Sequence, residues 1–267
     1  MIIDPRWIDV DLSDHPDDVG DGWIEQTGDE MMAATPEVEP FSSVFPQHMV
    51  PRSQWRERAE VTMANYRQIA APIVSQGREG SCVGFACKAA LENTIIRRFG
   101  RRNWRRLSGV SLYKRIGRSA SSGAYIPDGI RETRDRGVLP VNIAENIGEY
   151  QHTHPDTGFS RSLPTGWTET AKLFRASRVA TCRGMDEIAS ALLGGFTGVV
   201  GRQRHAINYQ YLTFDSRGNF FVCYGNSWSV AWGQEGFGFD SERTANSLTM
   251  YVILDVVTRP DITIPEL

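Results

Sequence analysis

The sequence predicts an α+β fold with two lobes, a helical lobe followed by a β-rich lobe. The chain has 267 residues, 40% of them hydrophobic, and seven Trp, which is enough for a sizeable core. Helical patterns of apolar residues dominate the chain after residue 50, and runs of β-branched and aromatic residues dominate its last third. Because sites often form where two layers meet, we expect the functional site in the cleft between the lobes.

The first 50 residues differ in composition from the rest. They hold twelve acidic residues and one Arg, with only scattered apolar residues. We therefore expect residues 1–50 to form an acidic, extended N-terminal arm, residues 51–257 to form the globular domain, and residues 258–267 to form a C-terminal tail. Within the domain, the helical lobe is predicted over about 70–145 and the β-rich lobe over about 170–257.

The helical lobe is expected to contain one long buried helix over residues 81–100. Apolar residues cover most of its surface, Ser81 is a candidate N-cap, and Gly100 is expected to end it. Further helices are predicted over residues 56–70, 107–118, 126–137 and 185–193, and a loop is predicted over 145–170.

Four later segments have the β-branched and aromatic content of strands. They are residues 196–200, 205–214, 219–228 and 249–257. The sequence DSRGN at 215–219 is typical of a tight turn, so the strands on either side of it are expected to pair as an antiparallel hairpin.

Several function classes are disfavoured by composition. The sequence has no run of about 18 apolar residues, so no membrane span is expected, and the acidic N-terminus lacks the features of a signal peptide. We therefore expect a cytoplasmic protein with reduced thiols. The four cysteines, Cys82, Cys87, Cys182 and Cys223, do not have the spacing of zinc ligands, so neither a metal nor a cofactor is expected.

A basic stretch spans residues 97–118 and contains nine Arg or Lys without an acidic residue. Binding of nucleic acid by this stretch would depend steeply on salt. A solvated basic face is the simpler interpretation, so nucleic acid is not an expected partner. The face is also a candidate docking site for the acidic arm or for another protein.

The segment QGREGSCVGF at 76–85 leads through glycines to Cys82, at the start of the predicted buried helix. A helix N-terminus favours a thiolate, and a nucleophilic thiolate needs a base, a group that orients the base, and donors for the oxyanion. His205 opens one predicted strand and Asn226 lies near the end of the next, so antiparallel pairing is expected to bring them together. The amide of Gln76 is expected to point at the same oxyanion as the Cys82 N–H.

Three segments resemble, in order, motifs of the papain-like (C1-type) cysteine peptidases. QGREGSCVGF resembles their active-site segment Q-G-x-C-G-S-C-W-A-F, and RHAINYQYL resembles their histidine strand. YGNSWSVAWGQEGFGF resembles their motif Y-W-x-x-K-N-S-W-G-x-x-W-G-x-x-G-Y. The resemblance covers about residues 70–257, and PRSQW at 51–55 is similar to the start of divergent members from phages and bacteria.

The resemblance implies a papain-like fold and hydrolysis of peptide bonds through a thioester intermediate. The implied catalytic residues are the nucleophile Cys82, the general base His205, the orienting Asn226 and the oxyanion donor Gln76. Trp228 is implied to shield the His–Asn hydrogen bond from water. Ser122 and Gly123 are implied to bind the backbone of a peptide or protein substrate.

Departures from the motifs keep a second hypothesis open. Glu79 precedes Cys82 by three residues and would oppose a thiolate, and Arg204 next to His205 would oppose an imidazolium. The alternative is a structural or decorating assembly protein built on the same fold, for example in a phage particle, which would make it virion-associated. As a peptidase inhibitor, the arm 1–50 would lie across the cleft; in an assembly protein, it would leave the body and dock on partner subunits.

Overall fold

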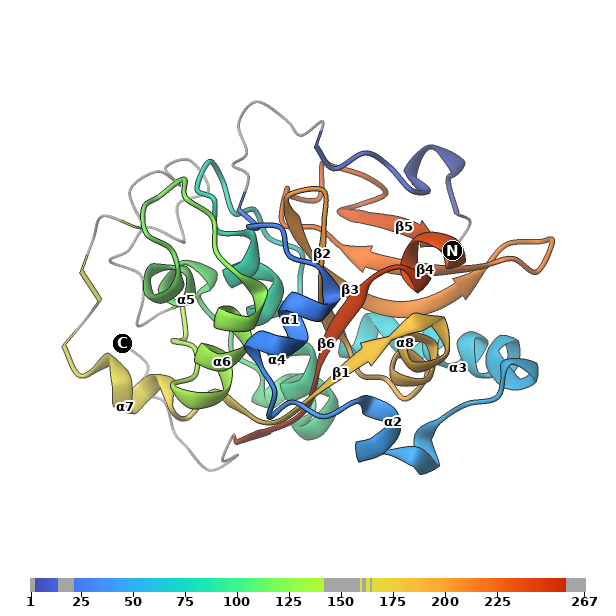
Figure 1. Ribbon diagram of the computed structural model, residues 1–267, viewed down its shortest axis with the longest axis horizontal. Coiled ribbons are helices and arrows are strands. Elements are labelled where there is room, and N and C mark those ends of the chain that lie inside the picture. Colours follow the sequence, from blue (N-terminus) through green and yellow to red (C-terminus); the bar gives the residue numbers. More distant parts are fainter. Residues whose placement is uncertain (1–2, 14–21, 142–158, 160–161, 164, 258–267) are drawn as a thin grey trace.

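The computed structural model describes residues 3–13, 22–141, 159, 162–163 and 165–257. Helices gather in one lobe and an antiparallel sheet forms most of the other (Figure 1). The predicted α+β class and its two-lobed arrangement are therefore confirmed. The C-terminal tail 258–267 and most of the predicted loop 145–170 lie outside the described residues.

The helical lobe is built on α4 (Cys82–Phe99), which contacts α5 (Gly109–Ile116) and α6 (Ile126–Asp135). The prediction of a long buried helix is confirmed, because nearly every residue of α4 as far as Ile96 is buried. Ser81 occupies the N-cap position, but its side chain makes no capping hydrogen bond. Gly100 ends the helix with a φ of 79°, a conformation that glycine adopts at little cost.

The sheet has six strands in the order β1-β6-β2-β3-β4-β5, and all neighbours are antiparallel. The strands are β1 (Arg175–Arg183), β2 (Gly198–Arg202), β3 (His205–Phe214), β4 (Phe220–Gly225), β5 (Phe237–Ser241) and β6 (Thr249–Val257). The predicted β3–β4 hairpin is confirmed. Residues 226–228, which were included in the predicted strand, lie beyond the end of β4.

The alternating side chains of β3 give the sheet two buried faces. Ile207 and Tyr209 pack into a core with α8 (Gly184–Leu193) and with the start of α3 (Trp55–Ile69). Ala206 points the other way and joins a core formed with α4. The sheet thus presents the first residues of β3 directly to the N-terminal half of α4.

The described parts of the arm, residues 3–13 and 22–50, pack on the body, whereas the assembly alternative has the arm leave it. Ile8 forms a bridge with Phe239 of β5, and Pro40 forms one with Thr181 of β1. In Figure 1 the segment leading into α1 (Gly28–Ala34) runs between the helical lobe and the sheet, and α2 (Phe41–Val44) follows. The arm contributes Leu12, Trp23, Met31, Val38, Phe41 and Val50 to the buried core.

Sequence patterns missed six elements of the described chain. They are α1, α2, β1, β5, α7 (Trp167–Ala171) and α9 (Glu242–Asn246). Helix α7 starts inside the segment predicted as loop, which corrects that prediction at residues 167–170. Short 3-10 helices occupy Pro5–Trp7, Pro46–His48, Arg52–Gln54 and Arg101–Asn103. Among the described helices, none has the length and apolar character that a membrane span requires.

Candidate active site

Cys82 is the first residue of α4 and faces the start of β3. The backbone N–H of Ala206 donates to its Sγ at 3.3 Å. The side chain is fully buried, and the helix N-terminus behind it favours negative charge on the sulfur. The thiol therefore lies where α4 and the sheet meet.

His205 and Asn226 come together as the hairpin predicts, with His205 Nε2 2.8 Å from Asn226 Oδ1. An amide oxygen only accepts, so this contact places the imidazole proton on Nε2 and makes Nδ1 the basic nitrogen. The backbone N–H of Asn226 donates to Gly236 O at 2.9 Å, which anchors the residue after the end of β4. Both side chains are at most 1% exposed.

Trp228 covers this pair. Its ring centroid lies 4.4 Å from that of His205, and on another side it packs edge-on against Trp232 at 5.5 Å. The indole is buried, so it keeps water away from the His–Asn hydrogen bond and raises the strength of that bond.

Gln76 ties the loop before Cys82 to the residue after Asn226. Its backbone N–H donates to Ser227 O at 2.8 Å, and its Oε1 accepts from Ser227 Oγ at 2.6 Å. Its Nε2 donates to Glu79 O at 2.8 Å, in the loop that leads to the thiol. Gln76 is thus buried beside the candidate nucleophile and bridges the two lobes.

Glu79 and Arg204, the two residues that depart from the motifs, lie in different surroundings. The Glu79 carboxylate is buried and accepts the backbone N–H of Phe159 at 2.7 Å through Oε1. Arg204 is exposed and occupies a two-residue turn with Gln203, both at positive φ. Because solvent screens an exposed guanidinium, we expect Arg204 to have little influence on His205.

Residues 22–24 of the arm cover the thiol, as in the alternative with the arm across the cleft, although the sequence did not indicate which residues of the arm would lie there. Ala124 N donates to Gly22 O at 2.8 Å, and Ile24 N donates to Ala124 O at 3.0 Å, on one side of the cleft. Trp23 N donates to Arg204 O at 3.0 Å on the other side. A Cβ on Gly22 would lie only 2.8 Å from Cys82 Sγ, so the glycine backbone passes directly over the sulfur.

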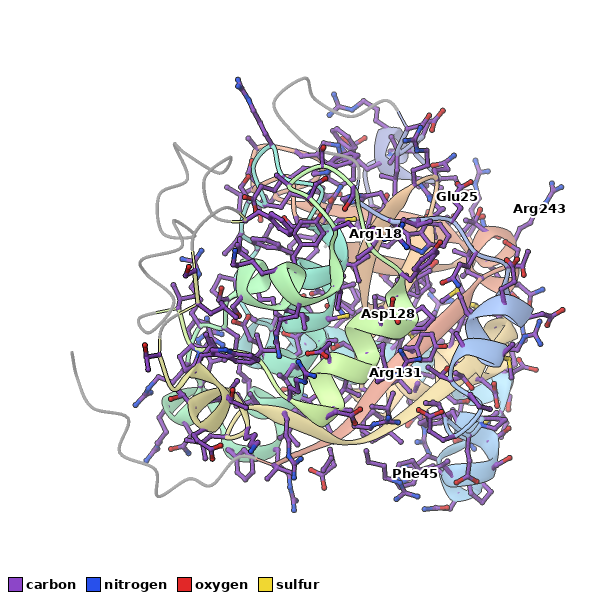
Figure 2. The ribbon with its side chains drawn as sticks, turned by 60° about the vertical axis from the view of Figure 1, so that its left-hand side comes forward. Glu25, Phe45, Arg118, Asp128, Arg131 and Arg243 are labelled. Atoms are coloured by element: carbon purple, nitrogen blue, oxygen red, sulfur yellow. The ribbon has the colours of Figure 1, made fainter. Side chains whose placement is uncertain are left out.

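Side chains of the same segment anchor it. The Trp23 indole is 8% exposed and lies on Gly201 of β2, where a Cβ would be 2.3 Å from the indole ring. Glu25 accepts the backbone N–H of Arg204 at 3.2 Å. Figure 2 shows Glu25 in the upper part of the view and Phe45, which follows α2, near its lower edge. On α6, Arg131 donates to Asp128 Oδ1 at 2.8 Å and to the arm at Ala34 O at 2.8 Å; both side chains are labelled in Figure 2.

Ser122 and Gly123 lie where residues 22–25 of the arm cross the cleft, and the two residues have different roles. The Ser122 Oγ accepts the backbone N–H groups of Arg118 and Ser119, so it shapes the turn. Gly123 approaches Gly22 so closely that a Cβ would be 3.0 Å from the Gly22 carbonyl. The residue that pairs with the extended segment is the next one, Ala124.

The other three thiols have surroundings unlike that of Cys82. Burial raises the pKa of Cys87, Cys182 and Cys223 well above the ordinary value for a thiol. Within the described residues there is no cluster of His, Cys, Asp or Glu arranged to hold a metal ion. The described site therefore offers nucleophilic chemistry at one thiol.

Comparison with solved structures identifies the fold. Xylellain, a cysteine protease from Xylella fastidiosa, matches with a TM-score of 0.56 at 17% identity, over 91% of this chain and 94% of that chain. Procathepsin B S9 from Trypanosoma congolense matches with a TM-score of 0.56 at 13% identity, over 87% and 85% of the two chains.

The proform of the ragweed pollen allergen Amb a 11, a cysteine protease, also matches with a TM-score of 0.56, at 16% identity. That match covers 71% of this chain and spans 64% of the ragweed protein. No protein-family model matches the sequence, and a comparison with curated proteins found no match. At these identities the likeness concerns the fold alone: the chain has the two-lobed fold of the papain-like cysteine proteases.

Proposed function

We propose that this protein is a cysteine peptidase that hydrolyses peptide bonds with Cys82, His205 and Asn226, and that its own arm covers the cleft. The observation that carries the proposal is the 2.8 Å contact between His205 Nε2 and Asn226 Oδ1 beneath Trp228, beside the Cys82 thiol. This arrangement supplies a nucleophile, a base of defined tautomer, and a group that orients the base.

The proposed reaction begins when His205 Nδ1 takes the proton of the Cys82 thiol. The thiolate attacks the carbonyl carbon of a peptide bond, and the developing oxyanion accepts hydrogen bonds from the Cys82 N–H and from the second N–H of Gln76 Nε2, the first being donated to Glu79 O. The intermediate collapses to a thioester as the imidazolium gives its proton to the departing amine. Water, deprotonated by His205, then attacks the thioester and releases the acid and the thiol.

The arm enters the proposal as a cover that must move before a substrate binds. Its backbone pairs with Ala124 and with Arg204 O on the two sides of Cys82, where an extended peptide would have to lie. Gly22 lies over the sulfur, and Trp23 fills the space against Gly201. These contacts support the hypothesis of an inhibitor in cis, and we favour it over a docking arm for partner subunits.

The first test is labelling by an iodoacetamide or epoxide-type thiol probe, followed by peptide mapping, on the wild type and on His205→Ala. Cys82 alone is expected to react, because the pKa values of Cys87, Cys182 and Cys223 are raised by burial. Loss of the base is expected to slow labelling by about 100-fold, the lower range for a general base. Peptide hydrolysis is expected to disappear in Cys82→Ser.

The denatured protein is the control, since all four thiols should then react at similar rates in both variants. If native Cys82 reacts at the same rate with and without His205, the proposed catalytic pair does not exist.

A further inference from the structure

The segment between β4 and β5, residues 226–236, carries both Asn226 and Trp228 and lies outside the helices and strands. Four of its residues have a positive φ, between 58° and 90°: Ser229, Gly233, Glu235 and Gly236. A positive φ is uncommon for residues other than glycine, and it persists where the surrounding structure fixes it. The segment therefore depends on contacts with other parts of the chain.

The first described stretch of the arm supplies such contacts. Residues 4–9, here called the N-terminal clamp, lie beside β5, the edge strand of the sheet (Figure 1). At one end of the clamp, Asp4 N donates to Gln234 Oε1 at 3.1 Å. At the other end, Asp9 N donates to Phe239 O at 2.8 Å. The clamp is thus bound both to the segment 226–236 and to the strand that follows it.

Trp7, within the clamp, begins a continuous series of ring contacts that ends at the candidate base. Its ring centroid lies 5.2 Å from that of Trp232. Trp232 packs edge-on against Trp228 at 5.5 Å, and Trp228 lies 4.4 Å from the ring of His205. Trp7 and Trp232 are both partly buried, whereas Trp228 is only 4% exposed. The outer two indoles therefore pack around the inner one.

The backbone joins the same parts of the site. Gly236 N donates to Trp232 O at 2.7 Å, and Asn226 N donates to Gly236 O at 2.9 Å. A displacement of Trp232 would therefore reach Asn226 through two backbone hydrogen bonds and would reach His205 through the ring of Trp228. Both partners of the His–Asn hydrogen bond depend on the position of Trp232.

We propose that Trp7 is a positioning residue for the active site, acting through Trp232 and Trp228. Its ring holds Trp232 against Trp228, so that water stays away from the His–Asn hydrogen bond. When the indole above that bond moves, the bond becomes weaker and its proton exchanges with solvent more readily.

The arm then has two opposed effects on the proposed enzyme. Residues 22–25 cover the thiol, whereas the N-terminal clamp supports the base. Removal of the whole arm would lose this support, so we expect activation to require displacement of residues 22–25 while the clamp stays bound. As a statement about catalysis this inference rests on the proposed function, but the effect of Trp7 on the His–Asn pair can be tested without it.

Nitrogen-15 NMR of the histidine rings in the whole chain measures exchange of the His205 Nε2 proton with water. The signal of His205 is identified by its absence in His205→Ala. Trp7→Ala is expected to speed this exchange at least about tenfold, because loss of an aromatic pair increases local opening. Trp7→Phe keeps an aromatic ring on Trp232 and is expected to return the exchange rate to within about threefold of the wild type.

Ile8→Ala is the matched control. Trp7 and Ile8 both pack on the hydrophobic cluster that includes Phe239, but Ile8 has no ring to stack on Trp232. The control should leave the exchange rate close to that of the wild type. Equal acceleration by Ile8→Ala would show that loosening of the clamp, and not loss of the Trp7 ring, exposes the pair, which would overturn the proposal. Wild-type exchange in folded Trp7→Ala would overturn it as well. If Trp7→Ala does not fold, Trp7→Leu takes its place with the same expected acceleration, since leucine keeps apolar surface but not the ring.

Peptide hydrolysis tests the catalytic consequence. The background is Trp23→Ala, which is expected to open the cleft, so that the cover does not limit the rate. In that background, Trp7→Ala is expected to lower kcat about tenfold at constant KM, and Trp7→Phe is expected to restore it. An unchanged or increased kcat would overturn the proposal. If no folded variant hydrolyses peptides, the proposed function is refuted, and the exchange rate of the Nε2 proton still decides the role of Trp7.

Discussion

Gly22 is the residue whose missing side chain allows the arm to contact the thiol. An added Cβ would lie 2.3 Å from the Gly80 carbonyl oxygen and 2.8 Å from Cys82 Sγ. Both distances are shorter than van der Waals contact, and Gly80 O is a backbone atom that cannot swing aside. Overpacking of this kind costs about 1–3 kcal/mol. The steric clash is relieved most easily if the arm lifts from the cleft.

We therefore expect Gly22→Ala to raise the labelling rate of Cys82 roughly tenfold to a hundredfold, by increasing the fraction of molecules with an open cleft. Gly28→Ala is the control. Gly28 belongs to the same arm, but its added Cβ would crowd Thr249 Oγ1 of β6 at 2.5 Å and not Cys82. Gly22→Ala with wild-type labelling would show that the arm does not limit access to the thiol.

At the scale of elements, the turn between β2 and β3 both presents His205 and holds the arm. Gln203 and Arg204 have φ values of 50° and 61°, as in the tight turns whose twist matches paired strands. Gln203 Oε1 accepts the Leu12 N–H at 2.7 Å, and Arg204 O accepts the Trp23 N–H at 3.0 Å. The same hairpin thus links the candidate base to both described parts of the arm.

A buried ion pair strengthens that link. Arg202 at the end of β2 contacts the carboxylate of Asp240 on β5 and the backbone carbonyl of Val10 in the arm. Tyr209 Oη also donates to Asp240 at 2.6 Å. Burial raises the pKa of Asp240 to about 6, although the Arg202 guanidinium opposes the rise.

The raised pKa of Asp240 predicts a pH dependence of stability. Between about pH 4 and 6 the folded protein holds a proton on Asp240 that the unfolded chain has lost, so the contribution of this residue to stability falls as pH rises through that window. The change amounts to roughly 3 kcal/mol at most for a shift of about two pKa units. Other carboxylates, such as Glu30 and Asp215, have lowered pKa values and act in the opposite direction.

The measurement is the free energy of unfolding in denaturant at pH 4.5 and pH 7.5, for the wild type and Asp240→Asn. The asparagine does not titrate; its amide oxygen still accepts from Arg202, and its amide N–H can donate to Tyr209 Oη. The wild type is expected to lose more stability, or gain less, than the variant over this interval. Parallel pH curves would contradict the assignment.

Local patterns predicted the elements that carry strong periodicity and missed those that depend on partners. Helix α4 and strand β3 have enough apolar residues to be recognised alone. Strand β1 contains three Arg, β5 has five residues including a Gly, and both pair only because β6 and β4 lie beside them. Helices α1 and α2 belong to the acidic arm, whose composition is that of a disordered segment, and they form on the body that buries Met31 and Phe41.

The candidate site was predictable where a motif fixed both residue type and order. Cys82, Gln76, His205, Asn226 and Trp228 were found in this way, and the structure brings them together. The contact of Gly22 with Cys82 could not be found, because neither a glycine nor its neighbours indicate which distant segment they meet.

At the scale of the whole molecule, the arm joins the two lobes and also contributes to their core. Residues 22–25 cross the cleft, whereas Met31, Val38, Phe41 and Val50 are buried farther along the same arm. Deleting residues 1–50 would therefore expose core surface in addition to opening the cleft. A cleaner test weakens one anchor of the arm and leaves the remainder in place.

Trp23→Ala removes the indole that packs on Gly201, and truncation of a buried Trp typically costs about 3–5 kcal/mol. Because the lost contacts hold the crossing segment, we expect the arm to detach locally, so that labelling of Cys82 and any peptide hydrolysis both rise at least tenfold. Phe45→Ala, farther along the same arm and near the lower edge of Figure 2, is the matched control. It should lower stability without changing labelling of Cys82. Equal acceleration by both variants would mean that general loosening exposes the thiol, and acceleration by neither would mean that a substrate reaches Cys82 without displacing the arm.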